Sequence, residues 1–119
     1  MKTTTRRAAL KKMSSKLLDL SFEDKEQVEK TINEICYLYQ EVSGITGTQT
    51  DTEYIVNVPT EVGVSLSLNH AASCMTDYNR THKLLKGIVQ AIRDKQDKHP
   101  GETIRVFYAG CGPFALFMT

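Results

Sequence analysis

The residues best suited to chemistry lie near the end of the sequence, where two glycines follow a run typical of a β-strand. Residues 103–109 are rich in β-branched and aromatic side chains and lead directly into Gly110, Cys111, Gly112 and Pro113. Gly110 can take backbone conformations that a Cβ would obstruct, and Gly112 lets a ligand lie directly against the main chain. Proline suits the first position of a helix, because its missing N–H leaves no bond unmade there. A strand, a glycine turn and a helix in succession predict a ligand site at the turn.

Two ligand classes fit this glycine spacing. Gly110, Gly112 and Ala115 match the dinucleotide fingerprint G-x-G-x-x-G/A, in which the start of the helix binds a pyrophosphate. On this interpretation the chain is the N-terminal part of a dinucleotide-dependent oxidoreductase. Pro113 argues against it, because proline removes one of the N–H groups that would bind the phosphate. A ligand without phosphate loses nothing at that position.

The segment Val106–Phe114 resembles motif I of class I S-adenosylmethionine-dependent methyltransferases. In that family the glycine loop lies under the methionine part of the cofactor. The resemblance implies a Rossmann-like fold with S-adenosylmethionine as the cofactor. The cofactor-binding residues that it implies are Tyr108, Ala109, Gly110, Cys111, Gly112 and Pro113. Many members have Asp or Glu near the end of this strand, where this chain has Tyr108 and Ala109, and neither the catalytic residues nor the methyl acceptor follow from the match.

A second resemblance lies upstream of the strand. Asp77, Arg80 and Thr81 form a D-x-x-R-T pattern similar to that of the helix before motif I in protein arginine methyltransferases. The resemblance implies that Arg80 binds the cofactor carboxylate, and a guanidinium can do so through two parallel hydrogen bonds. The alternative is a surface ion pair between Asp77 and Arg80, which are three residues apart on a helix.

Three amphipathic helices are predicted to position these residues. Apolar side chains recur at helical spacing in residues 7–20, from Ser21 and Asp24 to Val42, and in residues 69–96. The expected buried positions are Leu10, Met13, Leu17, Leu18, Leu20, Val28, Ile32, Ile35, Leu38, Tyr39, Val42, Ala72, Met75, Tyr78, Leu85, Ile88, Val89 and Ile92. His99, Pro100 and Gly101 end the last helix, because proline disfavours helix in the residue before it and glycine allows the chain to reverse.

The connection between the second and third helices contains polar and extended segments. Residues 43–52 are predicted to form a loop, and residues 54–58 are expected to be extended. Apolar residues then alternate from Val62 to Leu68, which fits either a hairpin about Pro59–Glu61 or an extended lead-in that packs on a helix. We divide the chain into a helical N-terminal region, 1–50, and a region 51–119 with the cofactor-flanking helix and the start of a Rossmann-like domain. The expected fold class is α/β, incomplete because the chain stops in the first helix after the glycine turn.

Other reactive side chains form no recognisable set. His70 and Cys74 share a helix face and could supply two metal ligands, but no further ligands are identifiable, so we predict no metal site. Cys111 lies where a helix start lowers the pKa of a thiol, but a nucleophile needs a base and no histidine is near it. His82 and His99 are expected to be exposed.

Composition limits the function classes. The net charge of +1 indicates no general attraction to nucleic acid, no stretch reaches the roughly 18–20 apolar residues of a membrane span, and three scattered cysteines form no disulfide framework. We therefore expect a cytoplasmic chain that binds a small-molecule cofactor, without membrane association, and that could self-associate through its apolar C-terminal segment. The expected function is that of the N-terminal portion of an S-adenosylmethionine-dependent methyltransferase, inactive as 119 residues. A helical protein-interaction module is the alternative from another class.

Overall fold

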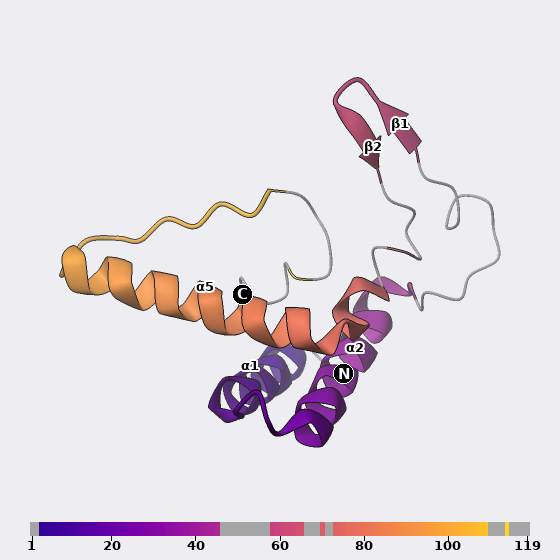
Figure 1. The fold of residues 1–119 in the computed structure, drawn as a ribbon, viewed down its shortest axis with the longest axis horizontal. Helices are drawn as coiled ribbons and strands as arrows, with labels where there is room; N and C mark the ends of the chain where they lie inside the picture. Colours follow the sequence, from indigo (N-terminus) through magenta and orange to yellow (C-terminus); the bar gives the residue numbers. More distant parts are fainter. Residues whose placement is uncertain (1–2, 46–57, 66–69, 71–72, 110–113, 115–119) are drawn as a thin grey trace.

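The computed structural model describes residues 3–45, 58–65, 70, 73–109 and 114. Three α-helices dominate them: α1 (Thr3–Asp19), α2 (Lys25–Ser43) and α5 (Tyr78–Lys98). A 3-10 turn, η1 (Cys74–Thr76), precedes α5, and β1 (Val58–Thr60) and β2 (Gly63–Ser65) form a hairpin. Helices α1 and α2 pack against each other and α5 crosses both, while the hairpin projects away from the helices (Figure 1). No helix in these ranges is both long enough and apolar enough to cross a membrane.

A tight polar turn joins α1 to α2. The backbone N–H and the hydroxyl of Ser21 both donate to Asp24 Oδ2, at 3.2 Å each. The sequence favours Ser21 as the N-cap with Asp24 in the first turn, but α2 begins after Asp24, whose carboxylate binds Ser21 and not the N–H groups of the helix. At the other end Gly44 adopts φ 72°, and its N–H donates to the Gln40 carbonyl at 2.9 Å. The short turn between Asp19 and Lys25 lets α2 return alongside α1.

The hydrophobic core lies where the three helices meet. Most predicted apolar positions face it, which confirms the helical spacing found in the sequence. Its buried members are Leu10, Leu17, Val28, Ile32, Ile35, Leu38, Met75, Leu85 and Phe114. Val42 is an exception: it is 56% exposed, because it lies in the last turn of α2 beyond the crossing of α5.

The predicted long helix 69–96 is interrupted in the structure. Polar side chains bind backbone carbonyls just before the break: the Cys74 thiol donates to His70 at 3.3 Å and the Thr76 hydroxyl to Ser73 at 2.6 Å. Asp77 then starts α5 as its N-cap. Such local side-chain bonds compete with helix continuation. The helix ends at Lys98, and Gly101 has φ 79°, as the predicted stop at His99–Gly101 requires.

The structure decides in favour of the hairpin between residues 58 and 65. Val58 pairs with Ser65, Pro59 with Val64 and Thr60 with Gly63 in antiparallel register. Glu61 and Val62 form the turn, and Val62 is 99% exposed. The predicted loop 43–52 and the boundary at residue 50 fall largely outside the described residues.

The predicted strand at residues 103–109 is wrong, and the α/β fold class is wrong with it. This segment has no regular secondary structure and runs back beside α5 (Figure 1). A β-strand needs a neighbouring backbone for its hydrogen bonds, and among the described residues the sheet consists of β1 and β2 alone. Val106 is 54% exposed and Phe107 90% exposed, whereas a first Rossmann strand would be covered on both faces. The described chain is therefore mainly helical.

Candidate cofactor-binding site at the start of α5

The start of α5 is held by the first and last residues of the D-x-x-R-T pattern. Asp77 Oδ1 accepts the backbone N–H of Arg80 at 3.4 Å, and the Asp77 carbonyl accepts the N–H of Thr81 at 2.9 Å. The Thr81 hydroxyl is buried and donates to the Met75 carbonyl at 2.9 Å. Tyr78 ties this end of α5 to α2, because its hydroxyl donates to Asn33 Oδ1 at 2.8 Å. Asp77 and Thr81 thus make the hydrogen bonds at the start of α5, and the Arg80 side chain takes no part in them.

Arg80 reaches from α5 to the residue that follows the glycine turn. Its guanidinium carbon lies 5.9 Å from the centroid of the Phe114 ring, a cation–π distance. Phe114 is only 8% exposed and belongs to the core. The contact therefore places the guanidinium beside Phe114, although the two residues are far apart in the sequence.

The surface ion pair between Asp77 and Arg80 does not form. The carboxylate binds the backbone N–H of Arg80, and within the described part of the chain Arg80 makes no ion pair. Its side chain is exposed. The guanidinium consequently keeps hydrogen-bond donors that can meet a carboxylate from outside.

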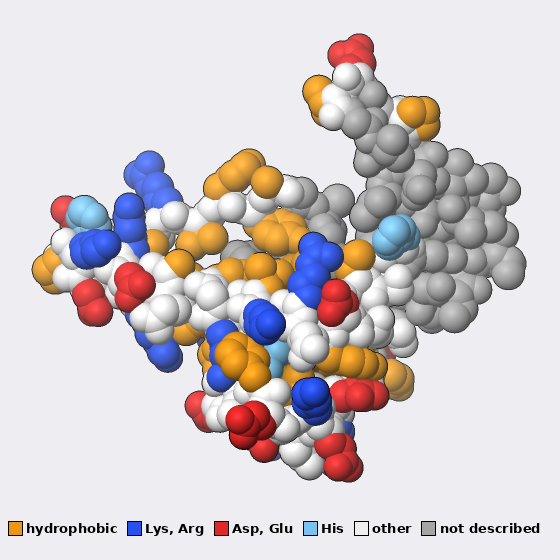
Figure 2. Space-filling model, in the orientation of Figure 1, with side chains coloured by type: hydrophobic (Ala, Val, Ile, Leu, Met, Phe, Trp, Pro, Cys, Tyr) orange, Lys and Arg blue, Asp and Glu red, His pale blue; other side chains and the backbone are white. Residues whose placement is uncertain are grey.

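The structure describes three of the seven predicted cofactor-binding residues. Arg80 and Ala109 are exposed, and Tyr108 is half-buried against the core. The other four, residues 110–113, lie outside the described residues. On the face shown in Figure 2, hydrophobic side chains gather between α5 and the segment 103–109.

The prediction that His82 is exposed is wrong. Its ring is 1% exposed, with Nε2 at 3.0 Å from the Leu17 carbonyl oxygen. Phe22 packs edge-on against it, with the centroids 5.0 Å apart, and the ammonium groups of Lys83 and Lys86 lie 5.9 and 4.9 Å from the Phe22 centroid. Burial lowers the pKa of His82 below its ordinary value, and the charge of Lys86 lowers it further. In the sequence, the only indication of this cluster is the spacing of His82 and Lys86, which places them on the same face of a helix.

His70 and Cys74 are the two residues that the sequence offered as possible metal ligands, without a predicted metal site. Cys74 is half-buried and its thiol donates to the His70 carbonyl, and the described residues contain no group of three or more metal-ligating side chains. Burial raises the pKa of the Cys36 thiol, which disfavours the reactive thiolate. His99 is partly exposed as expected, with Nδ1 at 3.2 Å from the Glu102 carboxylate.

Comparisons with family models, with curated proteins and with solved structures found no match to this chain. Its function must therefore be inferred from its own residues.

Proposed function

We propose that this chain is the cofactor-flanking N-terminal portion of an S-adenosylmethionine-dependent methyltransferase. In this proposal the Arg80 guanidinium binds the carboxylate of the methionine moiety, next to Phe114. The contact between Arg80 and Phe114 carries the proposal, because it joins the two segments that separately resemble the methyltransferase motifs. The proposal depends on Arg80 and Phe114 and does not require a β-sheet.

The proposal predicts that S-adenosylmethionine binds through Arg80. We expect Arg80→Ala to weaken binding about tenfold or more, since hydrogen bonds to charged groups contribute about 1.5–3 kcal/mol. The measurement is NMR titration of the whole chain, with shift changes expected at Arg80 and Phe114. 5′-Methylthioadenosine has the same adenosyl group without the carboxylate, so Arg80→Ala should leave its binding unchanged.

Arg93→Ala is the matched control, because Arg93 is an exposed arginine near the other end of α5. It should bind S-adenosylmethionine as the wild type does. The proposal fails if S-adenosylmethionine shifts no resonance, or if Arg80→Ala and Arg93→Ala bind it equally.

A helical protein-interaction module is a second candidate, favoured by the position of the core. Eight of its nine buried apolar residues lie between Leu10 and Leu85, and Phe114 is the ninth. This candidate predicts that the chain without residues 103–119 still unfolds in one cooperative transition. Its melting temperature should be lower, because Phe114 is lost, and S-adenosylmethionine should not change it. A chain that loses its helical circular dichroism on this deletion would exclude the candidate.

A further inference from the structure

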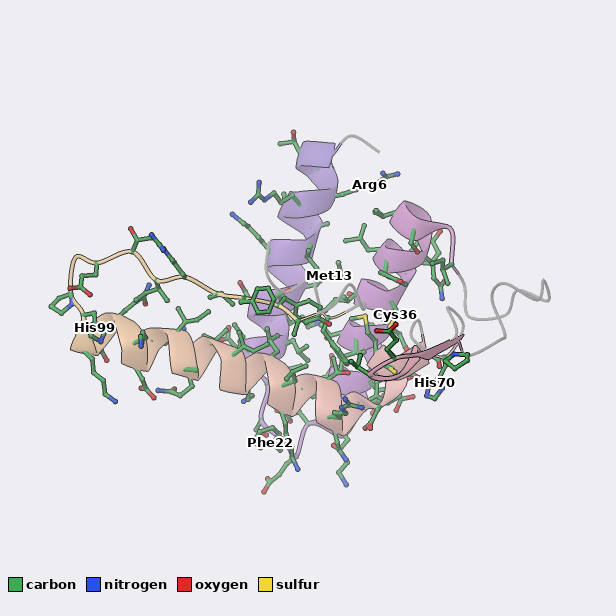
Figure 3. The ribbon with its side chains drawn as sticks, turned by 90° about the horizontal axis from the view of Figure 1, so that it is seen from above. Arg6, Met13, Phe22, Cys36, His70 and His99 are labelled. Carbon is green, nitrogen blue, oxygen red and sulfur yellow. The ribbon has the colours of Figure 1, made fainter. Side chains whose placement is uncertain are left out.

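A groove of about 790 Å³ follows α2 along most of its length and reaches α1. Its apolar part contains Ala9, Met13, Tyr37 and Leu38. Tyr37 is 64% exposed, unusual for an aromatic side chain with apolar neighbours. Figure 3 shows Met13 on the side of α1 that faces α2. Leu38 is 5% exposed and belongs to the core, and Met13 packs against it, so the exposed apolar surface of the groove is chiefly the Tyr37 ring.

The groove is bordered mainly by negative charge. Its described lining includes four glutamates and one lysine, and all five are exposed: Glu26, Glu29, Lys30, Glu34 and Glu41. The basic residues of α1 are not among the described lining residues. A molecule bound in the groove would thus contact apolar side chains on one side and glutamate side chains beside them.

We propose that this groove binds an amphipathic helix of a partner protein, one in which basic residues flank a narrow apolar stripe. The lining positions 26, 30, 33, 37 and 41 repeat at intervals of three or four, so the groove runs along one face of α2. From Glu26 to Glu41 this face is about 22 Å long, which matches about four turns of a second helix lying alongside. The lysines and arginines of such a helix would face the glutamates while its stripe covers Met13 and Tyr37.

The described helices of a second copy do not offer such a free stripe. Basic residues lie on both α1 and α5, but apolar residues of these helices are held in their own core: Leu10, Leu17 and Leu85 are 7%, 0% and 3% exposed. Using them in another groove would require unfolding the donor. The groove is also separate from Arg80, which lies on α5, so this inference does not depend on the proposed cofactor function.

The test uses the whole chain and a fluorescent peptide of about 16 residues, with an apolar stripe at helical spacing flanked by lysines. We expect saturable binding by fluorescence anisotropy that weakens as salt rises from about 50 to about 300 mM. The same peptide with glutamate in place of each lysine should not bind. Glu29→Lys combined with Glu34→Lys should weaken the lysine peptide about fivefold or more, because two attractive pairs become repulsive.

Two further variants separate the groove from general charge attraction. Tyr37→Ala removes exposed apolar surface from the floor and should also weaken binding, whereas Asp97→Lys changes an exposed charge near the far end of α5 and should not. Equal binding of both peptides, an equal effect of Asp97→Lys and the Glu29→Lys/Glu34→Lys double variant, or a concentration-dependent dimer in light scattering that excludes the peptide would overturn the proposal.

Discussion

Replacing Ile35 by alanine is expected to lower the free energy of unfolding by about 2–5 kcal/mol, the usual cost of removing a fully buried isoleucine side chain. Ile35 is 0% exposed, and it lies on α2, the helix that packs against α1, η1 and α5. Alanine favours helix more than isoleucine does, so a loss of stability would come from packing and not from the helix itself. In a domain whose total stability is about 5–15 kcal/mol, this loss would be large.

Urea denaturation followed by circular dichroism at about 222 nm measures the effect through the midpoint of the transition. Val42→Ala is the matched control, because Val42 lies on the same helix and is 56% exposed. Its midpoint should change by less than the equivalent of about 0.5 kcal/mol. Equal midpoints for the two variants would show that α2 does not pack as described.

Acidification is expected to destabilise the fold through His82. The ring is buried, and burial lowers its pKa below the ordinary value of 6.5, with a smaller contribution from Lys86. The carbonyls of Leu17 and Leu20 act in the opposite direction and only partly compensate. Above pH 6.5 the ring is neutral in the folded and the unfolded chain, so it adds no pH dependence. Below pH 6.5 the unfolded chain binds the proton first, and the free energy of unfolding falls until the pH passes below the lowered pKa of the folded state.

The measurement is the unfolding midpoint between about pH 7.5 and pH 5, a range chosen to lie above the ordinary pKa values of carboxylates. His82→Gln should flatten the dependence in this range, because a glutamine amide can donate to the Leu17 carbonyl but does not titrate. At neutral pH it should cost about 1–3 kcal/mol through imperfect packing and bonding. Val42→Ala, which changes no titratable group, should retain the wild-type slope. If His82→Gln keeps that slope as well, the ring is not buried in its neutral form.

Local pattern was enough to predict the helices. The spacing of apolar residues predicted α1, α2 and the end of α5 to within a few residues. It also predicted most of the buried residues, because a helix that packs on neighbours must turn its apolar face towards them. The stop after Lys98 followed from Pro100 and Gly101, whose backbone restrictions are local.

The predictions that failed concern residues whose state depends on distant partners. Residues 103–109 have the side chains of a strand, but a strand forms only beside another backbone, and this segment lies beside α5. His82 is polar and was assigned to the solvent, yet the end of α1 supplies the carbonyl that satisfies its ring 65 residues away in the sequence. The break before α5 depends on several weak side-chain bonds that spacing alone does not reveal.

At the start of α5, too, some features follow from local sequence and others from contacts with distant residues. Helical spacing of the apolar residues placed Asp77, Arg80 and Thr81 on one helix, but it predicted that this helix starts near residue 69 and not at Asp77. The burial of Thr81, the exposure of Arg80 and the position of its guanidinium over Phe114 follow from packing in three dimensions. Thr81 is buried with its hydroxyl on the Met75 carbonyl, and the Arg80 contact exists because the chain returns along α5 after Gly101 through packing between segments far apart in the sequence.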